Sequence, residues 1–275
     1  MEFFTALLSY TFLQNALIGG LLASVACGIA GSYVVVKRIG YLAGGIAHSV
    51  LGGMGIAYYL GSDPMIGALC AAIVSALTIG LVSIYWGEKE DTLISAIWAL
   101  GMSTGILFIS QTPGYNIDLM GYLFGNILMI PDQELIRLLI LDLVLIAAVI
   151  IFNRPLLAIV FDQEFARLRG LNTTVYYLLL LCLIAITVVM LIRVVGLILV
   201  IALLTLPAAI AGHVTQTLKQ MMFVAVALGM LFTSSGLALS YSPDLPPGAV
   251  IILIAVVGYI GVFLVQQIKK QWGRQ

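Results

Sequence analysis

The sequence predicts an all-α, polytopic membrane protein with about eight to nine transmembrane helices. Hydrophobic residues make up 62% of the 275-residue chain, charged residues make up only 9%, and the mean hydropathy is +1.17. A soluble domain carries about 25% charged residues, so this chain has too little polar surface to fold in water. Its apolar residues come in long runs rather than in alternation, which favours helices over a β-barrel.

Nine runs approach the length of about 20 apolar residues that a membrane-spanning helix needs. They cover approximately residues 12–36, 41–60, 64–86, 92–110, 133–153, 175–192, 194–211, 220–241 and 248–267. The sixth and seventh runs nearly merge at Arg193, so this boundary is the least sharply marked. No stretch between the runs is long enough for a soluble domain, and we expect residues 1–275 to form a single transmembrane domain.

The distribution of basic residues predicts the orientation in the membrane. When the turn at Lys37 and Arg38 is placed in the cytoplasm, ten of the 12 basic residues fall on the cytoplasmic side, and only Arg137 and Arg193 do not. This topology puts the N-terminus outside and the C-terminus in the cytoplasm. The formal net charge is zero, so electrostatics offers no argument for nucleic-acid binding.

The longest cytoplasmic stretch covers residues 153–174 and predicts a short amphipathic helix. Pro155 can open a helix and Gly170 can end the turn that follows it. The apolar face would consist of Leu156, Leu157, Ile159, Val160 and Phe161. Two interpretations are open for this helix: it docks on a partner protein, or it lies on the lipid headgroups.

Residues 111–131 form the other irregular stretch. The segment DLMGYLFGNILMIP is apolar but is broken by Gly121, Gly125 and Pro131. It is too short for an independent span and predicts a re-entrant or broken helix, which a bilayer tolerates only where protein or a water-filled cavity surrounds it.

No sequence motif of an enzyme is present. The chain has no HExxH, P-loop, GxSxG or Cys/His cluster with zinc-site spacing. We therefore expect no catalytic activity in this chain. Any ATP hydrolysis that drives transport would take place in another subunit.

His48 is the first candidate functional residue, because it lies within an apolar span that is rich in glycine and alanine. Small residues let helix backbones approach closely, and a neutral imidazole is a good ligand for zinc, manganese or iron. The alternative is a structural histidine that is hydrogen-bonded to a carbonyl group of a neighbouring helix.

Asp142 is the second candidate, because a carboxylate inside an apolar span is energetically costly and is usually functional or paired. It lies about two helical turns from the outer end of its span. The alternative is an interfacial residue bonded to Arg137. His213, at the cytoplasmic end of a span that contains Pro207, is interpreted as a helix cap or interface residue.

Five motifs occur in order along the chain, namely GSYVVVKRIGYLAGGIAHSVLGG, DLMGYLFGNIL, FDQEFARLRGL, VVGLILVIALLTLPAAIA and YSPDLPPGA. They resemble those of the permease subunits of ABC-type zinc, manganese and iron importers, the ABC-3 or metal-ion permease family. The resemblance extends over nearly the whole chain.

The resemblance implies a type II ABC importer-like permease fold in the inner membrane of a bacterial-type cell. It further implies a homodimer with a central translocation path, two cytoplasmic ABC ATPase subunits and an extracytoplasmic metal-binding protein. The segment of residues 153–174 resembles the cytoplasmic coupling helix of the family. Its residues that match the motif are Phe161, Asp162, Glu164, Ala166 and Gly170.

The sequence departs from the family pattern at two positions. The family usually has an aspartate four residues before the histidine, where both could hold a divalent cation, but here that residue is Gly44. Zinc-type members often have a second histidine where this chain has Ala99. His48 is therefore expected to be a transient ligand in the pathway, with Gly44, Asp142 and Arg193 as further pathway candidates.

The first hypothesis is an ABC importer permease for a divalent metal ion. No cofactor would be bound permanently, and ATP would bind to the partner subunit. One alternative keeps the same architecture but transports a metal chelate or another small solute, which the missing carboxylate at Gly44 would explain. Another alternative is an ATPase-independent channel or proton-coupled carrier, in which Asp142 would bind the proton.

Overall fold

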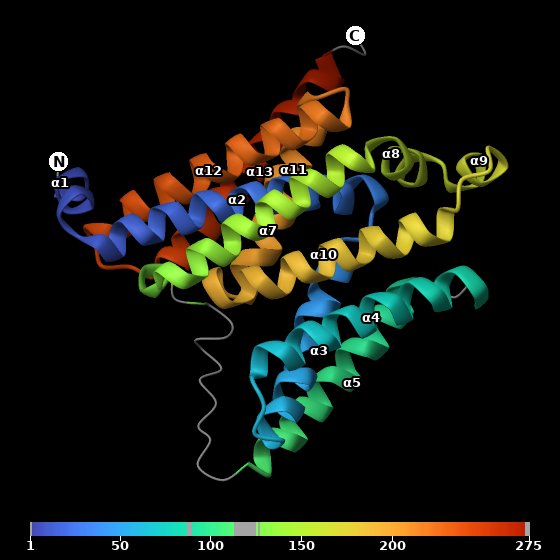
Figure 1. Ribbon diagram of the computed structural model, residues 1–275. Helices are drawn as coiled ribbons and strands as arrows, with labels where there is room; N and C mark the ends of the chain where they lie inside the picture. Colours follow the sequence, from blue (N-terminus) through green and yellow to red (C-terminus); the bar gives the residue numbers. More distant parts are fainter. Residues whose placement is uncertain (1, 87–89, 113–124, 126, 273–275) are drawn as a thin grey trace. The chain divides into compact units, whose positions relative to one another are not determined.

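The computed structural model describes residues 2–86, 90–112, 125 and 127–272, and every regular element in these residues is a helix (Figure 1). Contacts divide the chain into two compact units, each built from separate stretches of the sequence. Unit 1 consists of Met1–Val36, Leu123–Val144 and Val194–Gln275, and unit 2 consists of Lys37–Tyr122 and Leu145–Arg193.

Unit 1 is built around three helices that pack against one another: α11 (Leu197–Val214), α12 (Leu218–Tyr241) and α13 (Pro247–Trp272). Helix α2 joins them through two glycines, because Gly28 lies against Val226 of α12 and Gly31 lies against Leu204 of α11. The remaining elements are α1 (Glu2–Ser9), most of α2 (Thr11–Lys37), the 3-10 helix η1 (Ile127–Met129) and the first part of α7 (Asp132–Ile151).

Unit 2 is centred on α3 (Gly40–Tyr59), which packs against both α4 (Pro64–Trp86) and α5 (Glu90–Ser110). On α4, Gly80 lies against Leu178 and Leu181 of α10 (Thr173–Val195). The unit also contains the end of α7 and two short helices, α8 (Asn153–Phe161) and α9 (Gln163–Leu168).

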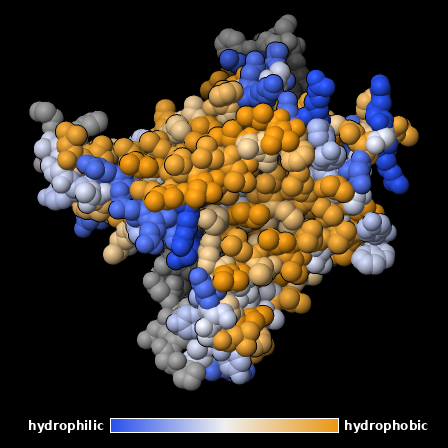
Figure 2. Space-filling model, viewed as in Figure 1, coloured by the Kyte–Doolittle hydropathy of each residue, from blue (hydrophilic) through white to orange (hydrophobic). Residues whose placement is uncertain are grey.

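Seven described helices are long and apolar enough to cross a membrane, namely α2, α4, α5, α10, α11, α12 and α13. The pair α7 and α8, bent by 79° at a short break, could supply an eighth span. Apolar residues cover most of the visible faces of the helices, as Figure 2 shows. The all-helical membrane fold is confirmed, and each of the nine predicted runs is a helix in the structure. Helix α3 is not among the seven.

Gly196 separates the sixth and seventh predicted spans. Its backbone has φ = +81°, a conformation that glycine adopts without steric cost, and α11 starts immediately after it. Gly125, with φ = +64°, lies directly against Val195 and Gly196, so two of the sequence motifs meet at this break. Helix α11 continues through Pro207 to Val214. Most of the predicted broken helix in residues 111–131 lies outside the described residues.

Candidate functional site

Glycines bring the backbone of α3 close to its two neighbours in unit 2. A Cβ atom at Gly52 would lie 2.8 Å from the carbonyl oxygen of Gly101 on α5. On the α4 side, Gly53 and Gly67 face each other so closely that a Cβ on either residue would collide with the carbonyl oxygen of the other. Small residues at helix contacts allow this approach in membranes. The position of α3 therefore depends on the absence of side chains at these contacts.

The imidazole of His48 stacks on the indole of Trp98 from α5. The ring centroids are 4.1 Å apart and the ring planes differ by 8°. His48 is half-buried, and neither of its ring nitrogens has a hydrogen-bond partner in the described part of the chain. Among these residues, the structure shows no bond from His48 to a carbonyl group of a neighbouring helix.

Gly44 lies one helical turn before His48 on α3 and is buried. No group of three or more His, Cys, Asp and Glu side chains gathers anywhere among the described residues. At this place, the chain therefore offers an imidazole and no carboxylate from the preceding turn. Such a donor set would bind a divalent cation only weakly.

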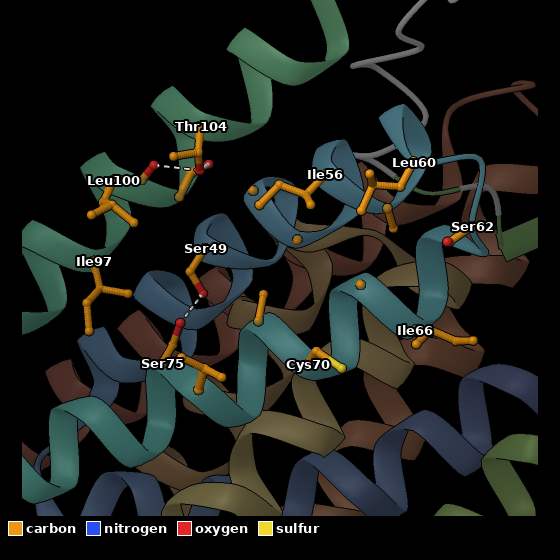
Figure 3. A pocket seen from close by; sticks show the side chains of 17 residues that line it. Ser49, Ile56, Leu60, Ser62, Ile66, Cys70, Ser75, Ile97, Leu100 and Thr104 are labelled. Carbon is orange, nitrogen blue, oxygen red and sulfur yellow. Dashed lines mark hydrogen bonds between the residues drawn. The ribbon is translucent and has the colours of Figure 1, made fainter. Parts of the chain in front are cut away.

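A cavity of about 490 Å³ lies among α3, α4 and α5 (Figure 3). Ser49 lines this cavity, but its neighbour in the sequence, His48, does not. Ser49 and Ser75 are joined across it by a hydrogen bond of 2.9 Å between their hydroxyl groups. Most of the wall is apolar, with residues such as Ile56, Leu60 and Ile66. None of the described residues that line the cavity is charged, so these side chains are not suited to hold a bare metal ion.

Asp142 lies in unit 1 on α7 and is only 4% exposed. Neither of its carboxylate oxygens has a hydrogen-bond partner among the described residues. Arg137 instead forms an ion pair with Glu134 at 2.7 Å, so the predicted alternative of an Asp142–Arg137 bond is wrong. A buried carboxylate without a partner is costly, and this side chain has no structural role that the contacts reveal.

Arg193 lies in the last turn of α10, in unit 2, and lines a cavity of about 250 Å³. The same cavity is lined by Asp63, Met54 and Met65, which come from the α3–α4 turn and its two flanking helices. His48 is not part of this wall. The structure thus places Arg193 at a mixed-charge cavity and does not bring it together with the histidine.

The segment predicted as a single amphipathic helix is in fact two helices, α8 and α9. Asp162 separates them with an extended backbone and caps α9 by accepting a hydrogen bond of 2.8 Å from the backbone N–H of Phe165. Side-chain capping of this kind favours a new helix start over continuation. Helix α8 also begins at Asn153, two residues before Pro155, and Gly170 follows α9 with φ = +80°.

The five predicted coupling residues divide into exposed and structural ones. Phe161 is 65% exposed, and Glu164 is exposed in the first turn of α9. Ala166 is buried, while Asp162 and Gly170 set the start and the end of α9. Of the predicted apolar face, Leu156, Ile159 and Val160 are buried as expected, whereas Leu157 and Phe161 are exposed.

Lys37 connects the start of the α2–α3 turn to this segment, a role that sequence reasoning missed. Its ammonium group donates hydrogen bonds to the carbonyl oxygen of Ile159 at 3.4 Å and to Oε1 of Gln163 at 3.2 Å. It also lies 5.3 Å from the ring centre of Tyr177 on α10, within the range of a cation–π contact. In the sequence, Lys37 indicates only the orientation in the membrane, because nothing there shows which residues lie near it in space.

The model of the ABC 3 transport family matches residues 9–266, which is nearly the whole chain. The protein belongs to this family. A manganese transport system membrane protein, MntC, from Halalkalibacterium halodurans is 34% identical over 253 residues, covering 92% of this chain and 87% of the relative. An uncharacterized membrane protein of Synechocystis is 47% identical over 253 residues, covering 92% and 90%.

A solved structure supports the same assignment. PsaBC from Streptococcus pneumoniae, determined in complex with a Fab, contains a chain that superposes on this one with a TM-score of 0.84 and 30% identity, covering 95% of this chain and 94% of that one. The chain is thus a multi-pass membrane permease with the fold of this ABC transporter family, as the five motifs predicted.

Proposed function

We propose that this chain is the membrane-spanning permease subunit of an ATP-driven importer of divalent transition metal ions. The observation that carries the proposal is the exposed apolar surface of α8 and α9, in a chain that matches the family over residues 9–266. Phe161, Phe165 and Leu168 are 65%, 53% and 85% exposed. A surface of this kind, on a segment with charged neighbours, suits docking on a cytoplasmic ATPase.

The contacts of this segment support a coupling role. Phe161 and Glu164 would contact the ATPase directly, while Asp162, Ala166 and Gly170 would keep α9 in shape for docking. ATP binding and hydrolysis would reside in that partner, and this chain would have no catalytic activity of its own.

The cargo is a divalent metal, and His48 would act as its transient ligand. Relatives named for manganese transport favour manganese over zinc and iron. The missing carboxylate at Gly44 fits a site that must release its ion quickly. An extracytoplasmic metal-binding protein would deliver the ion to the outer face.

The assembly would be a homodimer in the inner membrane of a bacterial-type cell, with each chain acting as one permease domain of residues 1–275. The N-terminus would lie outside and the C-terminus in the cytoplasm, because ten of 12 basic residues then face the cytoplasm.

Uptake of ⁵⁴Mn²⁺ in cells that lack their own manganese importers tests both parts of the proposal. His48→Gln should raise the KM for uptake while the permease still co-purifies with its ATPase. Phe161→Asp should abolish co-purification and uptake together. Normal uptake in His48→Gln would remove the ligand role. Normal uptake in the absence of any ATPase would overturn the proposal that the chain belongs to an ATP-driven importer.

A second candidate cargo is a metal chelate or another small solute, because Gly44 leaves no carboxylate beside His48. Competition of free Zn²⁺, Mn²⁺ and Fe²⁺ for the cognate binding protein separates the two cargo classes. Tight binding of a free ion supports the first, whereas binding only in the presence of a chelator supports the second. The ATPase-independent carrier would be favoured by loss of gradient-driven flux in Asp142→Asn.

A further inference from the structure

We propose that Trp98 positions the imidazole of His48 for metal binding, by a ring stack that takes the place of the usual hydrogen bond. The inference rests on the proposed role of His48 as a transient ligand and assigns a specific task to a second residue. Trp98 would not touch the metal itself, so it is a positioning residue.

The geometry of the stack is that of a close, nearly parallel ring pair. The centroids of His48 and Trp98 lie 4.1 Å apart with an 8° angle between the planes. A face-to-face contact covers one face of the imidazole and leaves the edges that carry the two nitrogens uncovered by the indole. The electron-rich indole face also favours an imidazole that has given electron density to a cation. The stack can thus hold the ring and leave its ligand atoms available.

The hydrogen bond that normally orients a ligating histidine is missing here. Such a histidine almost always donates its second ring N–H to a carboxylate, a carbonyl oxygen or water, which sets the ring orientation. Neither nitrogen of His48 has a hydrogen-bond partner in the described part of the protein. The stack on Trp98 is then the contact that sets the plane of the imidazole.

Trp98 is itself held in place. Its Nε1–H donates to Sδ of Met102, one turn further along α5, at 3.1 Å. The helices that carry the two rings are also fixed close together by glycine contacts on either side of the stack. Gly45 lies against Ile94, and Gly52 lies against Gly101. The backbones that carry the two rings are therefore held close together, which limits how far the rings can move relative to each other.

Uptake kinetics of the complete transporter test the proposal. Trp98→Leu removes the aromatic face and should raise the KM for ⁵⁴Mn²⁺ by about 3- to 10-fold, the range expected for losing an aromatic pair. The maximal rate per assembled transporter should stay the same. Trp98→Phe keeps a stacking ring without its N–H, and Met102→Leu keeps the volume without the acceptor. Each should give a smaller rise, about 2-fold.

A double-mutant cycle separates positioning from packing. In a His48→Gln background, Trp98→Leu should cause no further change in KM, because no imidazole remains to be positioned. Co-purification with the ATPase shows which variants assemble. Where Trp98→Leu does not assemble, Trp98→Phe and Met102→Leu replace it in the cycle.

Fluorescence reports on the same contact without relying on transport. The chain has three tryptophans, and the substitutions Trp86→Phe and Trp272→Phe leave Trp98 as the only one. Paramagnetic Co²⁺ or Mn²⁺ added to the purified complex should quench the emission of Trp98, because the ion would bind to the imidazole of His48 that stacks on the indole. His48→Gln should abolish the quenching at the same metal concentration.

The outcomes distinguish this inference from the proposed function. An unchanged KM in the Trp98 and Met102 variants, together with a raised KM in His48→Gln, would overturn the positioning role and leave the ligand role intact. An equal effect of Trp98→Leu in both backgrounds would also overturn it. Normal uptake in His48→Gln would remove the ligand role and the positioning role together.

Discussion

Substitution of Gly67 by alanine should separate α4 from α3 and destabilise unit 2. The new methyl group would lie 2.6 Å from Cβ of Ala57 and even closer to the backbone oxygen of Gly53. Carbon atoms in contact are normally about 3.5–4.0 Å apart, so the helices must move apart by about 1 Å. Neither neighbour has a flexible side chain that could turn away instead.

The expected loss is about 1–3 kcal/mol in the free energy of unfolding, the usual cost of overpacking. That corresponds to a fall of about 2–12 °C in the melting temperature. Gly261→Ala on α13 is the matched control, because a Cβ there would have no atom within 4 Å. Since alanine favours a helix over glycine, the control should melt at the same temperature or slightly higher.

The assay is thermal unfolding of the purified protein in one detergent. The fraction of protein that stays monodisperse is measured at each temperature. The same membranes are assayed for ⁵⁴Mn²⁺ uptake, because a shifted α3 would also move His48. Equal melting temperatures for the Gly67 and Gly261 variants would refute the argument that close glycine contacts hold α3 in place.

Three further predictions concern single side chains. Lys37→Met should lower metal uptake about 10-fold while the ATPase still co-purifies, because the hydrogen bonds to α8 and α9 are lost; unchanged uptake per assembled complex would contradict this coupling role. Gly44→Asp should tighten Mn²⁺ binding by about tenfold or more in equilibrium titrations, since it adds a charged ligand one turn before His48. An equal gain in Gly44→Asn, which has the same shape without the charge, would show that the added carboxylate does not bind the ion together with His48. Asp142→Leu should raise the free energy of unfolding by about 1–3 kcal/mol in denaturation experiments, because it removes a buried carboxylate that has no hydrogen-bond partner among the described residues; destabilisation would show that the carboxylate has a partner in the assembled protein.

The membrane fold could be predicted because it follows from composition and run length. A chain with 9% charged residues and long apolar runs has no stable alternative in water, and each predicted run is a helix in the structure. The break near Arg193 could not be placed to the residue, since the runs on both sides are equally apolar. It falls at Gly196, where the backbone adopts a positive φ that other residues avoid.

The coupling segment shows where helix-start signals compete. Pro155 and the apolar residues after it predicted one helix, but Asp162 caps a second one. A capping carboxylate in mid-segment is a signal that the sequence does contain, and FDQEF has the spacing of such a cap. The apolar pattern alone does not reveal this break, because apolar residues lie on both sides of Asp162.

His48 and Gly44 could be singled out from the sequence because their spacing is local, one turn of a single helix. The missing carboxylate, and with it the expectation of a weak site, is therefore a property of the primary sequence. Trp98 and Lys37 could not be found in that way, because each acts on a residue of another helix, 50 to 140 positions away. Which side chains meet across helices depends on how closely the backbones approach, and here the glycine contacts of α3 decide that distance.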